Sequence, residues 1–187
     1  MDNITLMVVI VAALAVGGAI VWYMQRQRSV HLRDKFGPEY ERTRAQVKDV
    51  RQAEATLAAR EKRVERLQIR ALTSDETARF TEVWRHVQTL FVDDPKGAVG
   101  EADHLVNEVM TARGYPVSDF HQRAADISVD HPVVVEHYRE AKAIADSNKA
   151  GSASTEDLRK AVIHYRALFE DLLEQRQPET TPIHARR

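Results

Sequence analysis

The side chains best suited to chemistry gather in the densest polar stretch of the chain, Arg113–Arg139. Aspartates at helix junctions suit caps, and an arginine and an aspartate within one helix can pair. Polar residues beside loops also commonly belong to binding sites. The pattern therefore favours a structural network, and it also defines a candidate interaction surface for a partner or a ligand. Seven residues near two expected helix junctions form this surface: Arg113, Tyr115, Asp119, Arg123, Asp126, Asp130 and His131.

The eight histidines raise the question of a metal site. A Glu-x-x-His motif occurs once, at Glu101–His104, whereas di-iron helical bundles need two such motifs and two further glutamates. The triplet His-Tyr-Arg begins at His137 and again at His164, which indicates similar packing roles for two helices. A phosphotransfer role would need only one exposed histidine, such as His86 or His164. Phosphate-binding glycine loops, nucleophile elbows and His-Glu-x-x-His motifs are absent, so the sequence assigns no catalytic residue, cofactor or metal ligand.

The elements that must position these groups are expected to be helices. Residues 73–176 read as an all-α bundle of about four helices, because capping signals alternate with apolar residues at helical spacing. Thr73–Glu76 forms a Thr-x-x-Glu capping box, Asp94–Pro95 suits the start of the next helix, and Gly114 suits its end. Further helices are expected over about 119–127, over about 132–148, and from Ser154 onward.

The segment 25–72 is expected to be a basic juxtamembrane linker followed by a long helix. Residues 25–70 contain 13 Lys and Arg against 7 Asp and Glu, a balance of +6, and residues 71–187 have a balance of −6. Gly37–Pro38 breaks the chain, and neither residue type returns before residue 73. Apolar residues recur every seven positions from Val50 to Val64, but glutamates occupy the alternate positions, so a strong coiled coil is not expected. The long helix is expected to pack on the following domain or against a second copy.

Residues 4–24 form an uncharged run of 21 positions and are expected to be a transmembrane helix. At about 1.5 Å per residue such a helix spans about 31 Å, close to the hydrocarbon thickness of a bilayer. Trp22 and Tyr23 at one end suit the membrane interface. A cleaved signal peptide is the main alternative, although signal peptides normally have a basic start and a shorter apolar core.

The charges around this run predict its orientation. No Lys or Arg precedes it, whereas four cations follow closely, so residues 1–3 are expected outside and residues 25–187 in the cytoplasm. Ala13 and Gly17 form a small-xxx-small pair, which suggests a homodimer through this helix. The four cations are Arg26, Arg28, Arg33 and Lys35.

The composition excludes several classes of protein. The absence of cysteine excludes disulfide scaffolds, thiolate zinc sites and cysteine nucleophiles. The balance of 27 Lys and Arg against 28 Asp and Glu argues against a nucleic-acid partner. Residues 177–187 cannot form a core and are expected to be a disordered tail.

Several short segments resemble an uncharacterised bacterial family of small envelope proteins. Members of that family have one N-terminal hydrophobic helix and an α-helical soluble part. The resemblance covers most of residues 36–173 and implies a bacterial envelope protein, without implying an activity. The matching segments are Phe36–Tyr40, Phe91–Pro95, Arg113–Val117, Arg123–Asp126, Val129–Pro132 and His164–Phe169.

These observations predict a single-pass cell-membrane protein, held in the lipid bilayer by residues 4–24, with a cytoplasmic helical domain. That domain is expected to act as an adaptor or scaffold through contacts with an unidentified protein partner. The alternative is a small-ligand-binding or enzymatic domain that uses the junction Arg113–Arg139. A third interpretation is a secreted or periplasmic domain, if the first helix is cleaved.

Overall fold

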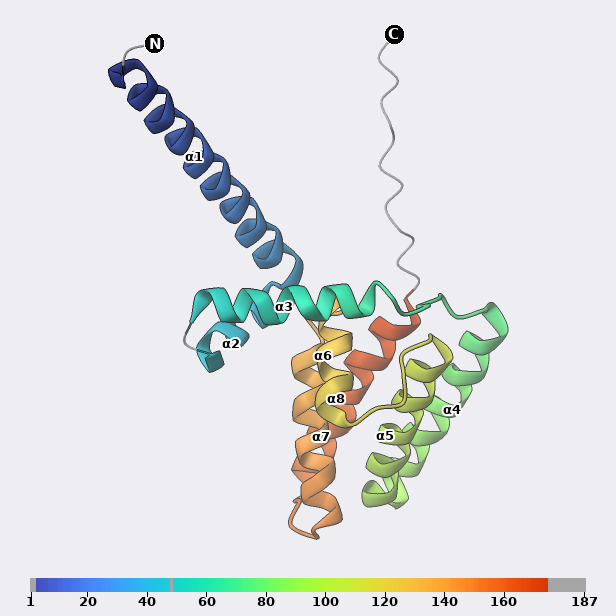
Figure 1. The fold of residues 1–187 in the computed structure, drawn as a ribbon. Coiled ribbons are helices and arrows are strands. Elements are labelled where there is room, and N and C mark those ends of the chain that lie inside the picture. The colour runs from blue at the N-terminus through green and yellow to red at the C-terminus, as the bar shows by residue number, and fades with distance from the viewer. Residues whose placement is uncertain (1–2, 48, 175–187) are drawn as a thin grey trace. The chain divides into compact units, whose positions relative to one another are not determined.

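A computed structural model of the protein describes residues 3–47 and 49–174, without the side chains of residues 3–6 and 8–11. These residues contain eight helices and no strand, which confirms the all-α fold (Figure 1). They divide into two compact units, one ending at Ala59 and the other beginning at Arg60. The predicted tail, 177–187, lies outside the described residues. The helices are α1 (Asn3–Phe36), α2 (Pro38–Val47), α3 (Val50–Val64), α4 (Ser74–Asp93), α5 (Pro95–Ala112), α6 (Phe120–Asp130), α7 (Val135–Lys149) and α8 (Thr155–Leu173).

The predicted membrane span lies within α1, the long helix at the start of the first unit (Figure 1). Among the described residues, no helix combines the length and the apolar character needed to cross a membrane. Seven of the 21 positions of the predicted span, 4–6 and 8–11, have side chains outside the described residues. The transmembrane assignment therefore stays a prediction.

The first unit turns sharply between α1 and α2. Gly37 makes this turn with a φ of 45°, a left-handed conformation that favours glycine. Pro38 is then the first residue of α2, where its missing N–H leaves no hydrogen bond unmade. Tyr40 on α2 is buried and donates a hydrogen bond of 2.9 Å from its hydroxyl to Glu54 on α3.

The long helix predicted up to residue 72 is shorter and interrupted. Around residue 49 the helix starts anew, because the Asp49 carboxylate accepts a hydrogen bond from the backbone N–H of Arg51. After Val64 the chain leaves the helix, and the backbone N–H of Arg70 donates to the carbonyl of Arg113 at 2.8 Å. Leu72, at the end of this irregular segment, is buried in the core of the second unit.

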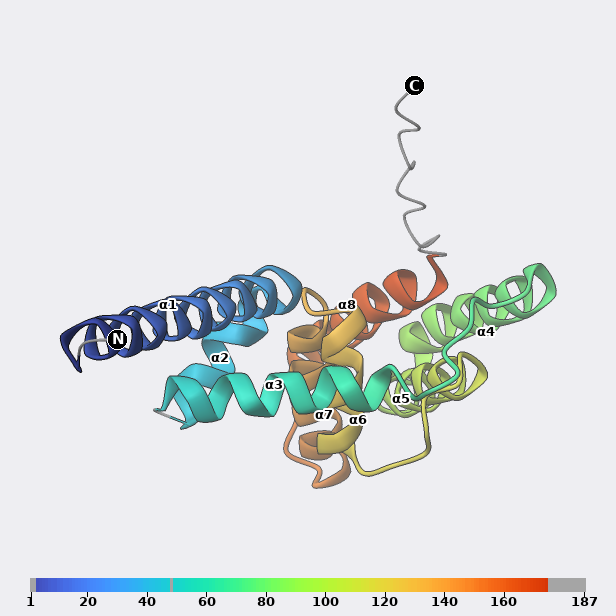
Figure 2. The same cartoon turned by 45° about the horizontal axis from the view of Figure 1, so that its top comes forward.

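The second unit contains the predicted bundle, which is built from the five helices α4 to α8 where about four were expected. α4 packs on α5, α5 on α8, and α7 on α8, and both views show α4 and α5 side by side (Figures 1 and 2). Their buried faces form one core, in which the ring of Trp84 stacks on that of Phe169 with centroids 5.0 Å apart.

Three of the caps predicted for this bundle are confirmed, whereas Asp130 is the last residue of α6 and does not cap α7, which begins after Val134 without a side-chain cap. Thr73 and Glu76 form the expected capping box at the start of α4. Asp94 accepts from the N–H of Gly97 at the start of α5, and Pro95 is its first residue. Ser154 and Asp157 form a second capping box before α8.

Candidate functional site

The seven predicted surface residues lie where α5 ends and around both ends of α6, and most of them face inward. Arg113, Tyr115, Asp126 and His131 are buried, the last with 2% of its surface exposed. The remaining three are Asp119, Arg123 and Asp130. Of these three, Asp119 is exposed, and Arg123 and Asp130 are partly buried. The set therefore contains four residues inside the bundle and three closer to its surface.

Arg113 is the centre of a buried polar group at the end of α5. Its Nη1 donates to the backbone carbonyl of Leu172 at 2.9 Å and contacts Nε2 of His131 at 3.3 Å. The other ring nitrogen of His131, Nδ1, contacts the carboxylate of Asp171. An arginine, a histidine and a carboxylate from three parts of the chain therefore tie α8 to the two loops that flank α6.

Tyr115 and Asp130 form a second pair of the predicted set. The Tyr115 hydroxyl donates to Oδ2 of Asp130 at 2.8 Å. Burial, together with the negative charge of Asp130, raises the pKa of the Tyr115 phenol. Gly114 permits this arrangement: its φ is 98°, and a Cβ atom there would lie 2.4 Å from the carbonyl oxygen of Gln68. A glycine is thus required between Arg113 and Tyr115.

The remaining residues of the set also have partners within the second unit. Asp126 accepts from Nε of Arg63 at 2.9 Å and from the side-chain amide of Gln122 at 2.7 Å. The Asp119 side chain accepts from the backbone N–H of Gln122 as the cap of α6, and this hydrogen bond lowers the pKa of its carboxyl group. The cap at Asp119 is the role expected of an aspartate near a helix end. The pairing predicted within one helix is wrong for Asp126, whose arginine partner is Arg63 and not Arg123.

Arg123 is the member of the set that reaches a concave surface. Its Nε donates to the Tyr138 hydroxyl at 3.2 Å, and its side chain also lines a groove of about 420 Å³ between α4, α5 and the loop before α6. Val117 lines the same groove and is 82% exposed. The seven residues therefore form several separate pairs, and they do not converge on one cavity.

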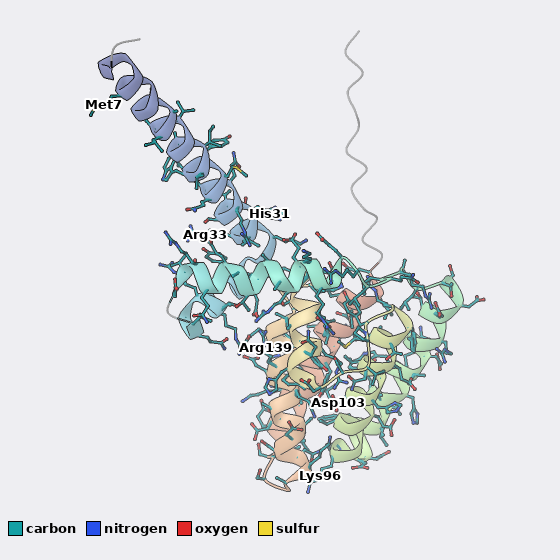
Figure 3. The ribbon with its side chains drawn as sticks, viewed as in Figure 1. Met7, His31, Arg33, Lys96, Asp103 and Arg139 are labelled. Carbon is teal, nitrogen blue, oxygen red and sulfur yellow. The ribbon has the colours of Figure 1, made fainter. Side chains whose placement is uncertain are left out.

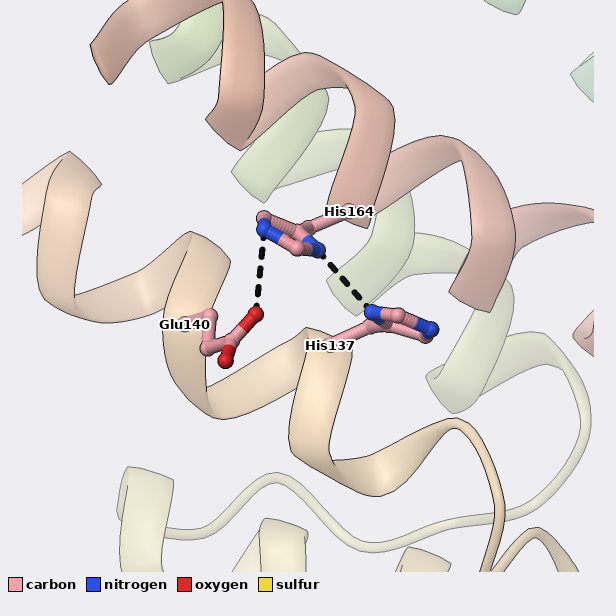
Figure 4. A group of neighbouring side chains, drawn as sticks. All are labelled: His137, Glu140 and His164. Atoms are coloured by element: carbon pink, nitrogen blue, oxygen red, sulfur yellow. Dashed lines mark hydrogen bonds and ion pairs between the residues drawn. The ribbon is translucent and has the colours of Figure 1, made fainter.

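A different cluster, on α7 and α8, brings together groups that the sequence did not connect. Nδ1 of His137 lies 2.9 Å from Nδ1 of His164, and Nε2 of His164 lies 3.0 Å from Oε2 of Glu140 (Figure 4). The two imidazole rings stack with centroids 5.1 Å apart. One nitrogen from each histidine and one carboxylate oxygen lie within 4.8 Å of one another, which is the composition of a metal-binding group.

The two His-Tyr-Arg triplets explain this cluster. α7 and α8 are joined by a short loop and pack on each other, and the tyrosine of each triplet is fully buried. Tyr165 donates to Asp103 of α5 at 2.9 Å and Tyr138 contacts Asn107 at 3.3 Å; Figure 3 labels Asp103 within the bundle. Because both tyrosines are held in the core, the histidines that precede them, His137 and His164, lie where α7 contacts α8.

Sequence analysis recognised the triplets and explained them by similar packing, which is what the tyrosines do. The missing information was the register between α7 and α8, since helical spacing alone does not say which residues on two helices meet. Glu140 follows His137 by three positions and so lies on the same face of α7.

Comparison with known proteins adds no family or relative. Neither a protein-family model, nor a curated protein, nor a solved structure matches the chain. The resemblance to a bacterial envelope family therefore stays a prediction.

Proposed function

We propose that this is a single-pass bacterial membrane protein whose helical bundle lies in the cytoplasm and acts as an adaptor or scaffold through protein contacts. The observation that supports the anchor is the uncharged run 4–24 and the exposure of its large side chains. Leu14, Trp22 and Met24 on α1 are 71%, 60% and 66% exposed. A row of large apolar side chains is unfavourable in water and favourable in a bilayer.

The orientation rests on charge. The cations that follow residue 24 favour the cytoplasmic side, and they begin a segment with an excess of six positive charges over residues 25–70. A basic segment beside an anchor is also attracted to anionic lipid headgroups. Ala13 and Gly17 on α1 would permit the close approach of a second copy.

Protein contact is the favoured role because most polar groups of the junction pair within the bundle; among its described buried atoms, Nε of Arg113 and Oδ2 of Asp126 have no hydrogen-bond partner. Arg113 and His131 are buried and face each other, and Tyr115 is engaged with Asp130, so these side chains do not surround a substrate-sized pocket. This geometry gives less support to a catalytic or ligand-binding junction. The groove beside Val117 combines an exposed apolar residue with polar walls, as protein interfaces often do.

The membrane part can be tested by cysteine labelling, since the natural chain contains no cysteine. Single variants Asp2→Cys and Ser152→Cys would be exposed to a membrane-impermeant maleimide in intact cells. We expect labelling at position 2 only, and labelling at 152 after the cells are opened. Labelling at position 152 in intact cells, or a mature chain that begins after about residue 20, would support the secreted alternative.

The contact surface can be tested with matched valines. A photo-crosslinking amino acid would replace Val117 at the groove or Val92 on α4, whose exposed fractions are 82% and 81%. We expect a discrete protein adduct in native membranes from position 117 and none from position 92. Equal adducts from both positions would indicate nonspecific contact and contradict the proposed surface.

A further inference from the structure

We propose that His137, Glu140 and His164 bind one divalent transition-metal ion, of which Zn²⁺ is the best suited. The chemistry of the donors supports a zinc site. Neutral imidazole nitrogens and a carboxylate are the common ligands of zinc, and a set of two histidines and one glutamate is known for zinc sites that keep an open position. The set has one negative charge when both rings are neutral, so it favours a cation.

The distance between the two histidine nitrogens also fits a shared ion. Two nitrogen ligands at about 2.05 Å from one ion lie about 2.9 Å apart at a right angle and about 3.4 Å apart at the tetrahedral angle. The Nδ1 atoms of His137 and His164 are 2.9 Å apart, at the lower end of this range. Small rotations of the rings would therefore direct both nitrogens toward a shared ion.

The two facing nitrogens depend on each other for a partner. Each imidazole nitrogen is either an N–H donor or a bare acceptor, so two facing nitrogens attract only if one proton, or one metal ion, lies between them. Glu140 contacts Nε2 of His164, the nitrogen of that ring that does not face His137. Its side chain is 51% exposed, so the carboxylate can move toward an ion held by the two Nδ1 atoms with little effect on packing.

Two neighbouring arginines pair with carboxylates other than that of Glu140. Arg139 pairs with Glu136 at 3.1 Å, and Arg166 pairs with Glu170 at 2.7 Å. His164 is partly buried, with 21% of its side chain exposed, which limits the access of water on one side of the pair. Three protein ligands leave at least one position of the ion to water or to a group from a partner.

The test is calorimetric titration of tag-free full-length protein in detergent with ZnCl₂, followed by chelation with EDTA. We expect one Zn²⁺ per chain at this site and no comparable response to MgCl₂, because magnesium prefers oxygen ligands. The double variant His137→Gln/His164→Gln should lose the site. Glu140→Gln should weaken Zn²⁺ binding by about tenfold, a change with little effect on folding because Glu140 is exposed.

His104 and Glu108 on α5 provide the matched control. Their side chains approach to 3.6 Å and have the same chemistry, but this pair is a lone histidine with a glutamate. His104→Gln should keep the zinc site, with far-UV circular dichroism confirming that every variant is folded. Absence of Zn²⁺ binding to the natural chain would show that the pair shares only a proton. Binding that survives the double variant would also overturn the proposal.

Discussion

Replacement of Arg113 by alanine should destabilise the bundle strongly, although the sequence pattern placed this residue on a candidate surface. The side chain is 9% exposed, and its Nη1 contacts the carbonyl of Leu172 and the ring of His131. Its removal leaves the carbonyl of Leu172 and the ring of the buried His131 without their cationic partner. Loss of one partner from a buried charged network costs about 3–5 kcal/mol.

Asp119→Ala is the matched comparison, because Asp119 belongs to the same predicted set and lies at the surface. Its side chain caps α6 by accepting from one backbone N–H, and loss of such a cap costs about 0.5–2 kcal/mol. The assay is urea denaturation of the two full-length variants and the natural protein in one detergent buffer, followed by far-UV circular dichroism. The midpoint should fall several times further for Arg113→Ala, at an unchanged m value.

Two results would refute this reasoning. A loss below about 1 kcal/mol for Arg113→Ala would mean that water reaches the vacated site and that the group is not an internal tie. A larger loss for Asp119→Ala than for Arg113→Ala would mean that the cap of α6 matters more than the buried network.

Three further predictions concern the second unit. Trp84→Ala should lower the free energy of unfolding by about 3–5 kcal/mol, measured by urea denaturation, because this ring is buried and stacked on an aromatic ring of α8. Burial and the charge of Asp103 raise the pKa of Tyr165, so this phenol contributes stability that is present below about pH 10 and lost above it. Urea denaturation from pH 9 to 11 should thus show a decline in the free energy of unfolding that is smaller in Tyr165→Phe, by about 1.4 kcal/mol over the whole range. The hydrogen bond from Arg70 lowers the pKa of Glu76 to about 2, from an ordinary value of 4.5, so its contribution is present above pH 4.5 and lost toward pH 2. Thermal unfolding between pH 5 and pH 2 should therefore depend less on pH in Glu76→Gln.

The helices of the second unit were predictable because each begins or ends at a strong local signal. The Thr73–Glu76 box, the Asp94–Pro95 start and the Gly114 end depend on residues within one turn of each other, so local chemistry determines them. The end of α3 was not predictable in this way. Residues 65–72 contain no helix breaker, and they leave the helix because the backbone of Arg70 pairs with Arg113, 43 positions later.

The same limit applies to the two polar groups. Sequence proximity joined Arg113 to His131 within one stretch, and the structure brings these two into contact, but their carboxylate partner Asp171 lies 40 positions beyond His131. His137 and His164 were noticed for their shared triplet, yet their contact depends on the pairing of α7 with α8. In both groups the sequence shows which polar residues are present. Which of them contact each other depends on how the helices pack.

Some of the seven predicted surface residues are buried and others are exposed or partly exposed, so variants that test for a protein partner must change only exposed residues. A variant that combines Arg113→Ala with surface changes would lose protein contacts whether or not Arg113 touches a partner, because a destabilised bundle presents every surface less well. Val117 and Arg123 line the groove, and Val117 is exposed without a structural role in the cap or the buried network. A change at Val117 that abolishes a contact while leaving the urea midpoint unchanged would therefore assign the surface directly, and the same loss with a lowered midpoint would assign only stability.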